Sequence, residues 1–123
     1  MQITGTFPEG IITEDGRICR DFILQEQTFR TRLEIAFDPD IDADLLTDPV
    51  YDAACLMAKR LQVEGLDKVT PEQVLDLSAQ DSDELIGKTM SLETQRSNFR
   101  GAAQAAEKER AGTAKAGAET LGD

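Results

Sequence analysis

The sequence lacks histidine and tryptophan, and it has little aromatic character of any kind. Its 123 residues include five phenylalanines, one tyrosine and two cysteines. Histidine is the commonest general base and the commonest metal ligand in proteins, so its absence argues against an enzyme and against a transition-metal site. Because aromatic residues make up only 5% of the chain, the core must be built mostly from aliphatic side chains.

Positive charge is also scarce. The 13 Lys and Arg residues face 24 Asp and Glu residues, which gives a net charge of −11 at pH 7. Contact with phosphates needs clustered basic side chains, so we expect no nucleic-acid partner and no anionic membrane partner. No apolar run approaches the ~20 residues of a membrane helix, and residues 1–6 lack the features of a signal peptide. These patterns predict a cytosolic protein whose acidity suits solubility or a basic or apolar protein partner.

The groups that could carry chemistry do not form a recognisable site. Cys19 and Cys55 are too far apart in sequence for a zinc motif, and we interpret them as small buried hydrophobic residues in a reducing compartment. The alternating aspartates between Asp38 and Asp44 suggest a calcium loop, but no register from Asp38 or Asp40 places Gly sixth and Glu twelfth. We therefore predict no catalytic residue, no metal site and no cofactor.

The order of turn and helix signals predicts an α+β fold in a single domain over residues 1–100. Asp15-Gly16 favours a β-hairpin over about 11–24. A small bundle of three to four short helices then follows. Its helices are expected at about 28–36, 49–63, 71–77 and 81–100.

The helix expected over 49–63 has the clearest signals. Asp48 can cap it, and Pro49 suits its first position. Apolar residues recur along it at helical spacing, so we expect this helix to be the main contributor to the core. The stripe consists of Val50, Ala53, Ala54, Met57 and Leu61.

The segment 101–123 is rich in Ala and Gly, and Leu121 is its only large apolar residue. Such a segment cannot bury enough surface to offset its ordering entropy. We predict a flexible, disordered C-terminal tail or linker, with nascent helix from Ala102 to Ala111 because alanine favours helices.

Two apolar stripes lie on the predicted helices, one formed by Phe29, Leu33 and Phe37 and the other by Leu85, Ile86 and Met90. They can pack in the core, or part of them can stay exposed to receive a partner helix. Short helices cover little apolar area, and the outer half of the last helix offers only Phe99. We predict a partner-binding surface that comprises Phe29, Leu33, Phe37, Met90 and Phe99.

Read as a whole, residues 10–86 resemble the tail assembly chaperones of Mu-like contractile-tailed bacteriophages and prophages. The resemblance lies in the order and spacing of several segments. They are the Asp15-Gly16 turn, the junction Leu24-Gln-Glu-Gln-Thr28, the helix Ala54-Cys-Leu-Met-Ala-Lys-Arg-Leu61, the stretch Val69-Thr-Pro-Glu-Gln-Val-Leu-Asp-Leu-Ser78 and the helix start at Asp81.

The resemblance implies a non-enzymatic role in the cytoplasm of a bacterial host. Such chaperones hold the long, helical tape measure protein soluble until tail tube subunits polymerise around it, and they are absent from the finished virion. The resemblance therefore implies the tape measure protein as partner; the tail tube protein and a second copy of the chain are left open as further partners. Two alternatives also stay open, namely a structural or adaptor subunit retained in the phage tail, and a small acidic regulatory protein that mimics DNA.

Overall fold

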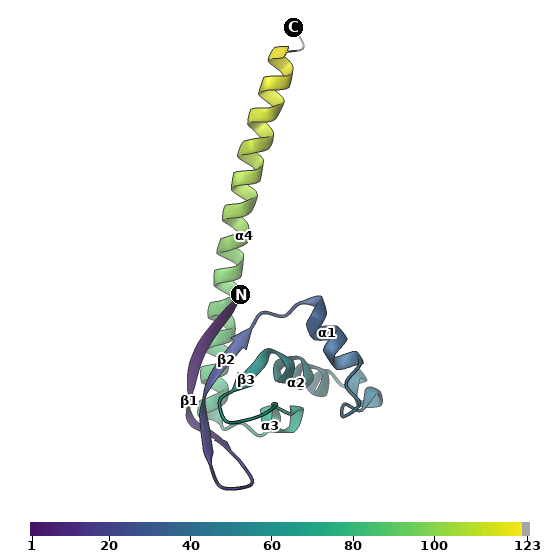
Figure 1. The fold of residues 1–123 in the computed structure, drawn as a ribbon, viewed down its shortest axis with the longest axis vertical. Helices are drawn as coiled ribbons and strands as arrows, with labels where there is room; N and C mark the ends of the chain where they lie inside the picture. Colours follow the sequence, from purple (N-terminus) through teal and green to yellow (C-terminus); the bar gives the residue numbers. More distant parts are fainter. Residues whose placement is uncertain (122–123) are drawn as a thin grey trace. The chain divides into compact units, whose positions relative to one another are not determined.

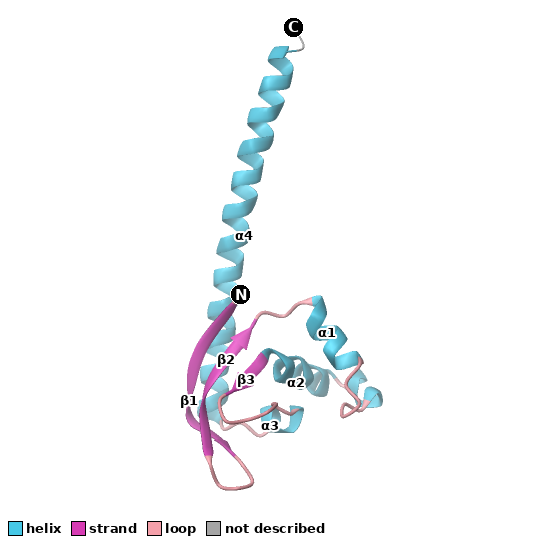
Figure 2. Ribbon diagram, in the orientation of Figure 1, coloured by secondary structure: helices cyan, strands magenta, loops and turns pink. Residues whose placement is uncertain are grey.

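The computed structural model describes residues 1–121, and it describes the side chains of residues 1–112. It divides into two compact units, Met1–Leu92 and Glu93–Asp123. The first unit has the predicted α+β architecture, with an N-terminal antiparallel hairpin followed by helices (Figures 1 and 2). The boundary between the units falls earlier than the boundary that we expected after residue 100.

The hairpin is longer than its sequence signal suggested, with strands β1 (Gln2–Ile12) and β2 (Ile18–Gln25). Its turn follows from the Asp15-Gly16 pair, because Gly16 adopts a φ of 84° that favours glycine. The backbone N–H of Thr13 donates to the carbonyl of Arg17 over 2.8 Å and closes the loop. The predicted hairpin is thus confirmed over 11–24, and β1 adds residues before it.

Residues 7–10 form a bulge inside β1. The pairing of β1 with β2 shifts between Thr6 and Ile11, and Gly10 within the shift has a φ of 94°. The strand order is β1-β2-β3, so β1 is an outer strand, which is where a proline such as Pro8 is tolerated. The bulge also places Phe7 in the core, where it is fully buried.

The predicted helix over 49–63 is wrong at its C-terminal end. Helix α2 covers Pro49–Arg60, and Leu61–Val63 is the short strand β3 that pairs with β2. The predicted stripe is also displaced, because Val50 is 62% exposed while Cys55 and Ala58 are buried. α2 therefore contributes mostly small side chains, and it is not the main contributor to the core.

The other helices begin close to their predicted starts. α1 covers Phe29–Ala36 and agrees with the prediction, whereas α3 (Pro71–Leu75) ends before the predicted residue 77. α4 (Ala79–Leu121) begins slightly early and continues past residue 100. A short 3-10 helix, η1 (Ala43–Thr47), occupies the acidic stretch.

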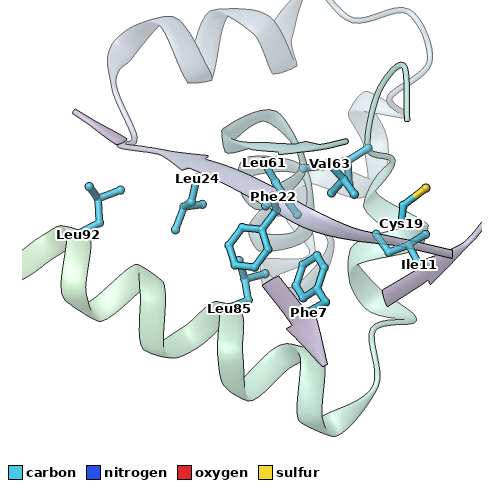
Figure 3. Packing of buried hydrophobic residues seen from close by; sticks show 11 residues of the cluster. Phe7, Ile11, Cys19, Phe22, Leu24, Leu61, Val63, Leu85 and Leu92 are labelled. Carbon is cyan, nitrogen blue, oxygen red and sulfur yellow. The ribbon is translucent and has the colours of Figure 1, made fainter. Parts of the chain in front are cut away.

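The core of the first unit lies between the sheet and the first turns of α4. The rings of Phe7 and Phe22 stack with their centroids 4.4 Å apart, and Leu85 of α4 lies beside them (Figure 3). Leu24 and Leu92 belong to the same buried cluster. The main apolar surface thus comes from the hairpin and α4.

A buried carboxylate ties α4 to the bulge of β1. Asp81 is 1% exposed, and its two side-chain oxygens accept hydrogen bonds from the backbone N–H groups of Glu9 and Gly10, each over 2.9 Å. The N–H of Asp81 donates to the side-chain oxygen of Ser78 over 3.1 Å. A negative charge near the helix start suits the helix dipole, and the contact of Asp81 with the bulge joins segments more than 70 residues apart.

In the second unit, α4 continues through the Ala/Gly-rich segment. All side chains from residue 97 to residue 112 are exposed. Helix over 102–111 agrees with the high helix propensity of alanine, and the exposure agrees with the lack of apolar residues. We predicted a flexible tail over 101–123, and the side chains of this segment beyond residue 112 lie outside the described residues.

Candidate partner-binding surface

Helix α1 presents an apolar stripe to solvent. Thr28 begins the helix through a capping box with Thr31. Phe29, Leu33 and Phe37, where Phe37 is the C-cap, are four residues apart and therefore share one face; they are 77%, 40% and 81% exposed. We call these three residues the α1 stripe. Large apolar side chains with this exposure, grouped on one face, are typical of a surface that binds a partner.

The opposite face of α1 holds the helix on the domain. Thr31 and Ile35 are 6% and 3% exposed. They are four residues apart and lie on the other side of the helix from the α1 stripe. Because this face of α1 is buried, the α1 stripe on the opposite face is exposed to solvent.

Ion pairs with α2 hold α1 and the chain that follows it. Arg32 donates two hydrogen bonds to the carboxylate of Asp52, over 2.8 and 3.3 Å, and this contact raises the pKa of the Arg32 guanidinium. Lys59 donates to Asp38, just after the helix, and this hydrogen bond lowers the pKa of the Asp38 carboxyl. The α1 stripe is therefore carried on a well-anchored helix.

The aspartates between Asp38 and Asp48 mostly serve as caps and ion-pair partners. The side chain of Asp42 accepts from the N–H of Asp44 and caps η1, and that of Asp48 accepts from the N–H of Val50 and caps α2. Asp40 pairs with Lys68, and this contact raises the pKa of the lysine. Among the described residues, no group of three or more His, Cys, Asp or Glu could hold a metal ion.

The structure brings three of the five predicted site residues together. Phe29, Leu33 and Phe37 form the α1 stripe, whereas Met90 is on α4, which lies away from α1 across the first unit (Figure 1). Met90 is 65% exposed, and Phe99, 67% exposed, belongs to the second unit. Within the first unit, Met90 thus lies apart from the α1 stripe.

Ile86 belongs to the second apolar stripe of the sequence, but the predicted partner-binding surface left it out. Ile86 is 57% exposed and precedes Met90 by one helical turn, so the two share a face of α4. The signal was present in the spacing, because Leu85 and Ile86 lie about 100° apart around a helix and cannot both face the core. Leu85 is the buried one, at 4% exposure.

A hollow of about 940 Å³ lies beside β3. Backbone of β1, β2 and β3 borders it, together with charged side chains of both signs, including Glu64, Lys68, Glu84 and Lys88. Glu84 and Lys88 are themselves an ion pair at 4.0 Å. Ile23, Leu66 and Val69 also line the hollow, so its lining combines apolar residues with charged residues of both signs.

Both cysteines are buried, as predicted, with Cys19 5% exposed and Cys55 fully buried. Burial raises the pKa of the Cys55 thiol, which disfavours the reactive thiolate. They are therefore packing residues in this fold.

Among the described residues, no helix combines the length and the apolar character that crossing a membrane requires. Comparisons with protein-family models, with curated proteins and with solved structures find no match to this chain.

Proposed function

We propose that this chain is a non-enzymatic tail assembly chaperone of a Mu-like bacteriophage or prophage, acting in the cytoplasm of the host. Its client is the tape measure protein, which it keeps soluble until tail tube subunits polymerise around it. The proposal rests on the resemblance of residues 10–86 and on one observation of the structure, the exposed α1 stripe. Phe29 and Phe37 are each more than three-quarters exposed on an otherwise anchored helix.

The α1 stripe suits a helical client. A tape measure protein exposes long apolar helical stripes before assembly, and two helices can bury such stripes against each other at the i, i+4 spacing. Three side chains form a small contact, so each chaperone binds weakly and tube subunits can displace it. Several copies along one client supply avidity without a tight single site.

The net charge supports the same role. At −11, the chaperones repel one another and the loaded complex stays dispersed.

The test is co-expression with a tape measure protein of a Mu-like bacteriophage. Client solubility is measured as the fraction in the supernatant, with the wild-type chain, without it, and with the double variant Phe29→Asp/Phe37→Asp. Removing two exposed aromatic contacts should return client solubility to the level without the chain. Because both side chains are exposed, the stability of the variant should stay within about 0.5 kcal/mol of wild type.

The control is Ile12→Asp, which adds one negative charge in place of an apolar side chain that is 71% exposed on the hairpin. It should keep the client as soluble as the wild-type chain does. Equal client solubility with and without the wild-type chain would refute the proposed role. Stoichiometric recovery of the chain from purified tails by mass spectrometry would instead favour a subunit retained in the particle.

A further inference from the structure

The first half of β1 has an open backbone edge. The N–H of Glu26 donates to the carbonyl of Met1 over 3.1 Å, which marks this pair as hydrogen-bonded in the antiparallel ladder. Such pairs alternate along a strand. The N–H and C=O groups of Gln2, Thr4 and Thr6 therefore point away from β2, toward the outer edge of the sheet.

The second half of the same edge is closed. Pro8 has no N–H group to offer, and the bulge turns the strand out of register. Asp81 occupies the N–H groups of Glu9 and Gly10. Natural proteins protect outer strands with such devices, and here they leave residues 2–6 uncovered.

The open edge also carries no charged side chain. Residues 1–8 form the longest run in the sequence without a charged side chain, in a chain whose net charge is −11. Outer strands that must stay single usually carry charged residues such as Lys. Two copies of so acidic a chain repel each other least where this uncharged edge meets its own counterpart.

Helix α4 also carries exposed apolar side chains in the first unit. Leu85 faces the core, and Glu84 and Lys88 line the hollow beside the sheet. Helical geometry then directs Ile86 and Met90 to the other side of the helix, away from this hollow. A second copy joined at β1 about a two-fold axis would bring its own α4 to the same face of the joined sheet.

We propose that two copies of this chain join through their β1 edges into one continuous six-stranded sheet. The strands run antiparallel about a two-fold axis at Thr4, so that Thr4 lies opposite Thr4 and Gln2 lies opposite Thr6. This register pairs all three open N–H and C=O groups of each copy and forms six hydrogen bonds. It ends where Pro8 begins to interrupt the ladder.

The dimer is independent of the proposed function. Phe29, at the start of α1, lines a hollow together with Met1 and Gln2 at the start of β1, whereas the dimer uses the outer backbone edge of β1. Each dimer carries two α1 stripes.

The first experiment measures the mass of the full chain by sedimentation equilibrium over a concentration series. The wild-type chain should shift from its monomer mass of 13.5 kDa to twice that value, and added salt should favour the dimer by screening the like charges. Thr4→Pro removes an N–H that β2 does not use. It deletes two of the six hydrogen bonds across the axis and should raise the dissociation constant roughly 30-fold.

Thr4→Val is the matched control, since it keeps the N–H group and suits a strand; it should dimerise like wild type. Circular dichroism confirms that both variants keep the fold. A wild-type chain that stays monomeric at every concentration overturns the proposal, as does a Thr4→Pro variant that folds and dimerises like wild type. The proposal would also be overturned if the β1 edge bound a strand of another protein, if Thr4→Pro abolished that binding, and if the wild-type chain itself formed no dimer.

A charge-swap experiment tests the position of the axis even if Thr4→Pro fails to fold. Thr4→Lys and Thr4→Glu each place two like charges directly opposite each other and should both be monomeric. Mixing the two variants should restore a dimer that contains one copy of each. Failure of the mixture to associate, or unchanged dimers of either variant alone, would contradict a two-fold axis at Thr4.

Discussion

Replacing Asp81 by asparagine should strongly destabilise the first unit, because one buried carboxylate accepts two backbone hydrogen bonds from the bulge of β1. Both bonds are 2.9 Å long, and the side chain is 1% exposed, so water cannot replace what is lost. Asparagine has nearly the same shape, but only its oxygen can accept. Its NH2 group would face the second N–H, donor against donor.

The expected loss can be worked out from these contacts. A hydrogen bond to a charged group contributes about 1.5–3 kcal/mol, and a buried N–H left without an acceptor costs about 1–3 kcal/mol. Removing one buried negative charge offsets part of this cost. We therefore expect a decrease of about 3 kcal/mol in the free energy of unfolding, a large part of the 5–15 kcal/mol that is usual for a domain of roughly this size.

The assay is urea denaturation at neutral pH followed by far-UV circular dichroism, with Asp83→Asn as the matched control. Asp83 lies one helical half-turn away and is exposed, so its substitution should cost less than about 0.5 kcal/mol. Hydrogen exchange adds a local measurement, because the amides of Glu9 and Gly10 should lose protection in the Asp81 variant. A variant as stable as the control, with both amides still protected, would refute this account of the bulge.

Two further predictions concern an ion pair and a close contact. The hydrogen bond from Lys59 lowers the pKa of Asp38 in the folded protein. The contribution of this pair to stability is therefore present above the unfolded pKa of about 4 and is lost as the pH falls through the lower folded pKa. In acid denaturation profiles, the difference in stability between wild type and Lys59→Met should shrink below about pH 4. Gly5→Ala would place a methyl carbon in steric overlap with the ring of Phe22, so it should destabilise the protein by about 1–3 kcal/mol in thermal melts. Gly87→Ala is the comparison, because no atom lies within 4 Å of the added methyl group. Since alanine favours a helix more than glycine does, this variant should stabilise the protein by up to about 1 kcal/mol.

Local signals fixed the starts and turns of this fold. Asp48-Pro49 begins α2, and Thr70 with Gln73 forms a capping box at the start of α3, because the atoms that satisfy the first free N–H groups lie within a few residues. Asp15-Gly16 makes the hairpin turn for the same kind of reason. These features need no information from distant parts of the chain.

The apolar spacing of α1 also identified the candidate stripe. Phe29, Leu33 and Phe37 do share one face, and all are exposed. Periodicity alone could not say whether this face or the one with Ile35 packs inward, since both carry apolar residues. That choice depends on which face of α1 packs against the rest of the domain. Met90 was grouped with the α1 stripe because the spacing of apolar residues along the sequence gives no information on the distance between two helices.

Tertiary contacts decided the rest. Leu61–Val63 continues the apolar pattern of α2, but the open edge of β2 offers backbone partners there, and the chain leaves the helix to pair with it. Asp81 sits in an acidic helix start that looks solvated in the sequence, yet the bulge delivers two N–H groups to it from more than 70 residues away. A sequence determines which hydrogen bonds can form between near neighbours, whereas partners that are distant in the chain are chosen only when the core closes.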